Sequence, residues 1–114
     1  MLLSQIRKLK ELREQYGLEL AVAKQSGSTI ESDDECLSIL SFFDLHNKIV
    51  SAVNEYAQIT GDDPTAIAST VVLLDAIAGG IAGVLSAREP EMAKSALSQG
   101  EETKMKHYLK GKES

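Results

Sequence analysis

The stretch PTAIASTVVLLDAIAGGIAGVLSA, residues 64–87, decides the fold because it is nearly uniformly apolar and carries a single charged residue, Asp75. Pro64 suits the first turn of a helix, where its missing N–H would have no partner, and Asp63 can cap that turn. A helix that is apolar on most sides needs cover on most sides. We therefore predict a central apolar helix over about residues 64–87, packed among other helices.

The two faces of this predicted helix differ in size rather than in polarity. The large face carries Ile67, Val71, Leu74, Ile81 and Leu85, and the small face carries Ala68, Val72, Asp75, Gly79, Ala82 and Ser86, with Gly83 beside it. Small residues allow another backbone to come close, so Gly79 and Gly83 are candidate interface residues. Four or five helices barely cover both faces, and we expect a second copy to complete the bundle as a two-fold dimer.

The remaining sequence also predicts helices. Residues 2–24 carry an apolar stripe with a weak point at Gly17, where the helix is expected to bend or end. Ser32 and Glu35 form a capping box that opens a helix running to about Ile59, and Gly61 follows its end. Pro90 opens a helix to about residue 98, after which Gly100 ends it or residues 101–110 continue. We predict an all-α fold, a four- to five-helix bundle in a single domain over residues 1–110, with a frayed tail over 111–114.

Composition limits the classes of function. The net charge is −5, which disfavours nucleic acid as a partner because phosphate-binding proteins present basic surfaces. The one cysteine, Cys36, excludes a disulfide within the chain and fits a reducing compartment. The first residues lack the pattern of a secretory signal, so we expect a cytoplasmic protein.

Two polar residues in apolar surroundings are candidate interface or buried polar residues. Asp75 interrupts the most apolar helix, and we expect it to pair with a basic side chain of a neighbouring helix rather than to act on a ligand. His46 falls on the apolar stripe of the second helix, and we expect a core or interface histidine rather than a general base. We predict no catalytic residue, no cofactor and no metal ligand.

A membrane span is the first alternative for the apolar segment. Residues 66–87 are long enough to cross a bilayer, and Gly79-x-x-x-Gly83 is a spacing common where membrane helices pack. Asp75 near the middle opposes a span, and so does the absence of Trp or Tyr at either end. We therefore expect a buried helix rather than a single-span, membrane-active protein.

A hydrolase is the further alternative. The spacings Glu11-x-x-Glu14 and Glu31-x-x-Asp34 resemble the acidic pairs with which all-α nucleotide pyrophosphatases of the MazG type hold magnesium. The resemblance covers these four residues and implies hydrolysis of a nucleotide triphosphate with Mg²⁺. Our main expectation is instead a non-enzymatic interaction protein: an adaptor, chaperone or inhibitor that binds another protein, of a size often encoded by phages or mobile elements.

Overall fold

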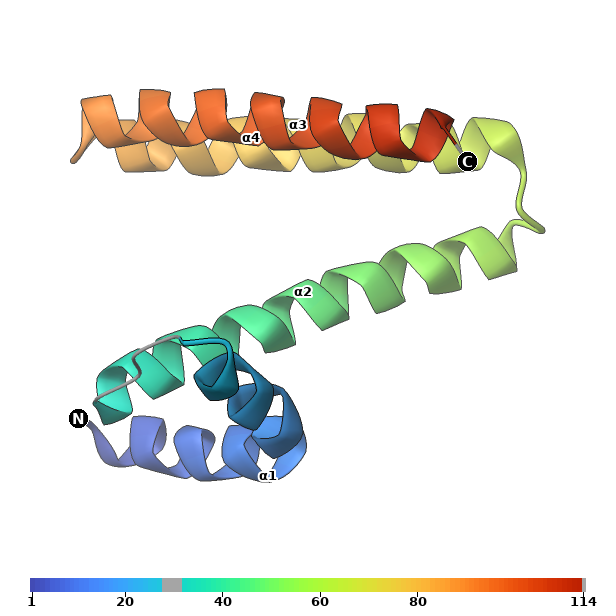
Figure 1. Cartoon of the computed structure of the whole chain (residues 1–114). Helices are drawn as coiled ribbons and strands as arrows, with labels where there is room; N and C mark the ends of the chain where they lie inside the picture. Colours follow the sequence, from blue (N-terminus) through green and yellow to red (C-terminus); the bar gives the residue numbers. More distant parts are fainter. Residues whose placement is uncertain (28–31, 114) are drawn as a thin grey trace. The chain divides into compact units, whose positions relative to one another are not determined.

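The computed structural model describes residues 1–27 and 32–113, and every regular element in these residues is a helix. The helices are α1 (Leu3–Gln25), α2 (Asp33–Ile59), α3 (Pro64–Ser86) and α4 (Pro90–Lys112), as Figure 1 shows. The predicted all-α class is therefore confirmed. The chain divides into two compact units, Met1–Ile59 and Thr60–Ser114. The single domain, the bundle around α3 and its completion by a second copy stay predictions.

The first unit is held together by the packing of α1 against α2. Its buried core consists of Leu9, Leu12, Tyr16, Leu20, Cys36 and Leu40, with Leu37 and Phe43 packed against it. Leu12 and Leu40 are fully buried, and each such leucine stabilises the fold by about 1.5–3 kcal/mol relative to an exposed one. Cys36 is thus a buried core residue of the first unit.

α1 bends where the sequence predicts weakness. Tyr16 has non-helical backbone angles (φ −119°, ψ 24°), and Gly17 follows it directly. The change in direction is visible along the blue helix in Figure 1. The bend lets both halves of α1 place apolar residues, Leu9 before it and Leu20 after it, in the core shared with α2.

The predicted helix starts are confirmed by their capping bonds. The backbone N–H of Glu35 donates to Oγ of Ser32 at 3.1 Å, at the start of α2. The backbone N–H of Ala66 donates to Oδ2 of Asp63 at 3.0 Å, and Pro64 occupies the first turn of α3. Each bond satisfies an N–H that has no partner within the helix. Gly61 and the neighbouring Asp62 have positive φ (65° and 58°), which ends α2.

The second unit is a helical hairpin. α3 and α4 lie side by side and run antiparallel, joined by the connection of residues 87–89 (Figure 1). Ala82 of α3 and Ala93 of α4 are buried, and small side chains there allow the helices to pack closely. α4 continues without interruption through Gly100 to Lys112, so the possible end at Gly100 is wrong. Ion pairs one turn apart, such as Lys106–Glu102 at 3.3 Å, help to offset the cost of glycine within the helix. Ser114, the last residue of the predicted frayed tail, lies outside the described residues.

Candidate interaction surface

α3 presents large apolar side chains to solvent. Ala82 is its one buried residue, and Val72, Ile81 and Val84 are 70%, 64% and 76% exposed. Other large apolar residues of α3 are 40–58% exposed: Ile67, Val71, Leu73, Leu74 and Ile77. Contiguous apolar surface of this kind marks sites of association with proteins or membranes. The cover predicted for both faces of α3 is therefore not supplied by the second unit itself.

The glycines of α3 are not explained by packing within the chain. A Cβ atom built at Gly79, Gly80 or Gly83 would have no other atom within 4 Å, apart from the backbone of its own helix and its chain neighbours. Glycine inside a helix costs about 0.5–1 kcal/mol relative to alanine. Three such residues therefore lower the stability of α3 without allowing a closer approach of α4. Their predicted role at an interface with another molecule stays a prediction.

α3 and α4 enclose a groove of about 580 Å³. From α3 it is lined by the small residues Ala78, Gly79 and Ala82, together with the larger Ile81 and Leu85. The α4 side contributes Ala96, Leu97 and Gly100. Asp75, Glu101 and Lys104 add charged groups to this lining, so the groove combines an apolar surface with a small ionic cluster.

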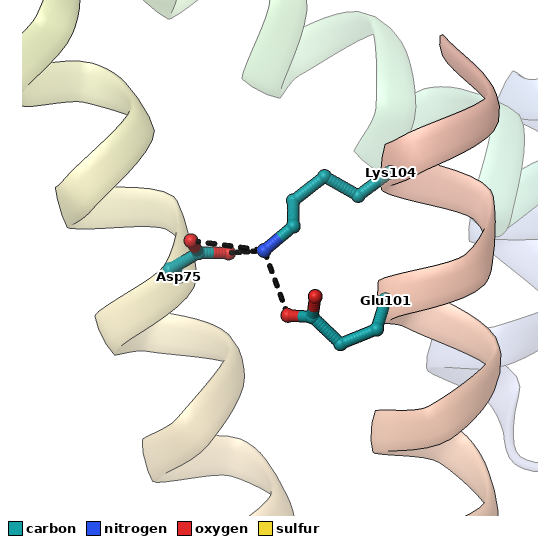
Figure 2. Close-up of polar contacts among 3 residues, drawn as sticks. All are labelled: Asp75, Glu101 and Lys104. Carbon is teal, nitrogen blue, oxygen red and sulfur yellow. Dashed lines mark hydrogen bonds and ion pairs between the residues drawn. The ribbon is translucent and has the colours of Figure 1, made fainter. Parts of the chain in front are cut away.

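Asp75 is paired with a lysine of the neighbouring helix, as the sequence predicts. Nζ of Lys104 lies 3.3 Å from Oδ2 of Asp75 and 2.7 Å from Oε1 of Glu101, and Figure 2 shows the ammonium group between the two carboxylates. The hydrogen bond to Glu101, followed by that to Asp75, raises the pKa of Lys104 above its usual value. Because the Asp75 side chain is 54% exposed, this cluster orients the hairpin rather than contributing much stability.

His46, predicted as a core or interface histidine, does not lie in the core of the first unit. The buried side of α2 carries Cys36, Leu40 and Asp44, each four residues after the last. His46 is two positions beyond Asp44 and points to a different side of the helix, where it is exposed. Its Nδ1 lies 3.5 Å from Oδ1 of Asn47. A role for His46 at an interface stays a prediction.

The sequence interpretation missed a buried polar group in the first unit. Asp44 is 7% exposed, and its carboxylate accepts a 2.8 Å hydrogen bond from the Tyr16 hydroxyl and pairs with Lys48 at 2.7 Å. The hydrogen bond from Lys48, followed by that from Tyr16, lowers the pKa of Asp44. The signal in the sequence was the i,i+4 spacing of Asp44 and Lys48, combined with Leu40 one turn earlier on the buried side.

The acidic pairs of the magnesium alternative are only partly described. Glu31 lies outside the described residues, whereas Glu11, Glu14 and Asp34 lie within them. In residues 1–27 and 32–113, no three His, Cys, Asp or Glu side chains gather closely enough to hold a metal ion. Arg13, between the first pair, binds the carboxylate of Asp33 at 2.8 Å.

No protein family model, curated protein sequence or solved structure matches this chain. Two of the described helices, α2 and α3, are long and apolar enough to cross a membrane by length and composition alone. Core helices of soluble proteins meet the same criterion, so this finding is weak evidence for a span. The function is therefore inferred from the exposed surfaces of the helices.

Proposed function

We propose that this protein is a non-enzymatic helical interaction protein, an adaptor, chaperone or inhibitor, that acts in the cytoplasm by binding another protein. The observation that carries the proposal is the exposure of α3, a 23-residue helix with one buried residue. Binding would remove apolar side chains such as Val72, Ile81 and Val84 from water, and burial of apolar surface is the main favourable term in protein association.

The charge distribution of the hairpin supports a protein partner in water. α4 carries ion pairs on its exposed surface, including Lys94–Glu91 and Lys106–Glu102. These charges keep one side of the hairpin hydrated, while exposed apolar residues of α3 form the other side. An apolar centre with a polar surround is the usual anatomy of a protein interface.

Site-directed photo-crosslinking in the native host tests this function. A crosslinking amino acid at Val84, which is 76% exposed on α3, is expected to capture a defined protein. The matched control places the same group at Lys94, whose side chain is 77% exposed on α4, and is expected to capture none. Equal capture at both positions, or none at Val84, would contradict binding through α3.

A membrane-active role is the second candidate, because α3 combines sufficient length for a span with very little burial. The hairpin itself opposes a complete span. α4 would have to leave α3, which breaks the Asp75–Lys104 pair, since its charged residues are costly inside a bilayer. A bound surface helix would keep the hairpin intact.

Fractionation separates the two candidates. The interaction protein is expected in the soluble fraction, whereas recovery in the membrane pellet after a salt wash would support the membrane role. An added measurement is binding to vesicles of neutral lipid, for which the net charge of −5 supplies no electrostatic attraction. Sedimentation with such vesicles would show that apolar insertion is sufficient.

A further inference from the structure

The beginning of α1 presents basic and apolar side chains together on one exposed side. Their spacing of i, i+3, i+4 and i+7 keeps them on one side of a helix, and we call them the N-terminal face: Leu3, Ile6, Arg7 and Lys10. Arg7 stands two positions before the buried Leu9, and Lys10 stands two positions before the buried Leu12. Two positions correspond to about 200° around a helix, so these two cations point away from the core that α1 shares with α2.

The residues of the N-terminal face are open to solvent. Leu3 and Ile6 are 62% and 51% exposed, and Leu2, which precedes the helix, is 69% exposed. Arg7 and Lys10 are exposed as well. Within residues 1–27 and 32–113, no carboxylate forms an ion pair with either of them. Their charges are therefore available to another molecule.

The charge of the chain is divided unevenly, with the positive part at this end. Residues 1–10 contain three basic residues and no acidic residue, a charge of +3, although the whole chain carries −5. The remaining residues therefore carry −8. Glu11 and Glu14 follow in the next turns, and Oε2 of Glu11 lies 3.7 Å from Nζ of Lys8. The positive surface is thus confined to the first ten residues.

We propose that the N-terminal face docks this protein on a membrane surface that contains anionic lipids. Leu3 and Ile6 enter the boundary between the headgroups and the acyl chains, while Arg7 and Lys10 extend to the lipid phosphates. α1 lies in the plane of the surface. Its packing against α2 is kept, because Leu9 and the other core residues of α1 are on a different side of the helix.

The combination of side chains favours lipid over an acidic protein. The apolar part of the face is aliphatic, whereas the residues that dominate protein interfaces are enriched in Trp and Tyr. A bilayer with anionic lipids offers negative charge at its surface and an apolar boundary about 5–10 Å deeper, which matches cations beside Leu3 and Ile6. The negative charge of the other residues is repelled by the same surface, so the contact is limited to the start of α1.

This attachment goes beyond the binding of a protein through α3 and does not depend on it. It is peripheral, because the attraction depends on charge and a salt wash releases the chain. Insertion of α3 would instead persist through the wash and would not need anionic lipid. Because the two surfaces lie on different helices, variants of α1 test the docking without altering α3.

Fluorescence of a single tryptophan measures the docking of α1. The chain has no tryptophan, so Leu3→Trp adds one probe at the N-terminal face of the full chain. Vesicles of phosphatidylcholine with about one third phosphatidylglycerol are expected to shift its emission to the blue, and about 0.5 M salt should reverse the shift. Leu18→Trp, at a position 77% exposed beyond the bend in α1, is the control and should show no shift. No shift at residue 3, or an equal shift with phosphatidylcholine alone, would overturn the proposal.

Sedimentation with the same vesicles measures the contribution of the cations. Each basic residue near an anionic surface changes the affinity about fivefold, so Arg7→Gln/Lys10→Gln is expected to bind about 25-fold more weakly than the natural chain. Lys106→Gln/Lys110→Gln removes the same charge from exposed positions of α4 and is expected to change binding by less than about twofold. An equal loss in the two variants would overturn the assignment of the contact to α1.

Two further measurements separate lipid from protein as the partner. Leu3→Ser/Ile6→Ser keeps every charge and is expected to bind the vesicles more weakly, with circular dichroism to check that the chain is still helical. Unchanged binding would overturn the entry of these side chains into the bilayer. Capture of an acidic protein by a crosslinking amino acid at residue 3, in a chain that does not bind anionic vesicles, would assign the face to that protein and overturn the proposal.

Discussion

The hydroxyl of Tyr16 in α1 donates a 2.8 Å hydrogen bond to Oδ1 of Asp44 in α2, at the residue where α1 bends. Oδ2 of the same carboxylate lies 2.7 Å from Nζ of Lys48. The two oxygens of Asp44 thus bind two different helices, and the polar group becomes part of the packing of the first unit. The bend in α1 and the hydrogen bond to the buried acid therefore occur at the same residue, Tyr16.

The variant Tyr16→Phe is expected to lower the Tm of the first unit by about 4–8 °C, because one oxygen of a buried carboxylate loses its donor while packing of the ring is kept. Tyr108→Phe is the control, since Tyr108 is 58% exposed on α4. Thermal unfolding followed by circular dichroism measures both. Equal decreases in Tm for the two variants would show that the buried hydrogen bond of Tyr16 does not stabilise the first unit.

Acid is expected to weaken the first unit through Asp44. Its pKa in the folded chain lies below the ordinary 3.8, so its contribution to stability is present above pH 3.8 and is lost as the pH falls through the folded value. Hydrogen exchange at Leu12 and Leu40 from about pH 6 down to pH 2 reports this unit. Asp44→Asn is expected to be less stable at neutral pH and to lose less on acidification. An unchanged acid response would contradict the assignment.

The leucine core of the first unit predicts a large effect of truncation. Leu12→Ala or Leu40→Ala is expected to reduce the free energy of unfolding by about 2–5 kcal/mol, because each residue is fully buried and leaves a cavity. In a unit of this size such a loss approaches the total stability. Leu18→Ala, at a position 77% exposed, is the control and should change stability by less than about 0.5 kcal/mol. Urea unfolding that ranks Leu18→Ala with the core variants would refute the packing described.

Two glycines are expected to respond to alanine in opposite directions. Gly100 lies within α4 with open space at its Cβ position, so Gly100→Ala should stabilise the hairpin by about 0.5–1 kcal/mol. Gly61 has φ of 65°, so Gly61→Ala should destabilise the chain by about 1–2 kcal/mol. Thermal unfolding of both variants under one set of conditions measures the contrast. Shifts of the same sign would contradict it.

The Asp75–Lys104 pair is expected to contribute little to stability, because both side chains remain partly exposed. Asp75→Asn should lower the Tm by a small amount at low salt, and about 1 M salt should remove the difference. A double-mutant cycle with Lys104→Met isolates the coupling of the two residues. A large coupling that persists at high salt would mean that the pair is buried in an assembly.

The helix starts were predictable because they depend on local chemistry. The side chains of Asp63 and Ser32 each accept a hydrogen bond from a free N–H group of a first turn, whatever packs on the helix later. Pro64 suits the same turn because it has no N–H to leave unpaired. The bend at Tyr16 was predictable for a similar reason, since glycine weakens a helix wherever it occurs.

The helix faces were harder to predict because they depend on which neighbour is present. A stripe of apolar residues placed His46 in the core or at an interface, and the structure shows that α1 packs on the side of α2 that carries Leu40 and Asp44. Glycine is common at the end of a helix, so Gly100 was a possible end of α4. The helix nevertheless continues, because the Glu–Lys pairs that follow favour a helix. The sequence was sufficient to predict that Asp75 pairs with a basic side chain. Which basic residue it pairs with, Lys104, depends on how α3 and α4 are aligned.

Three residues, Ala87, Arg88 and Glu89, connect α3 and α4. Because the connection is short, the contacts between the two helices join near neighbours in the sequence. Contacts between near neighbours in sequence form in microseconds to milliseconds, whereas the 23 residues of α4 take about one to five seconds to be added at about 5–20 residues per second. Once α4 is free to fold, its pairing with α3 is therefore fast compared with the time taken to synthesise it. The time for which the apolar residues of α3 lack their charged neighbour is determined by the rate of translation rather than by the rate of folding.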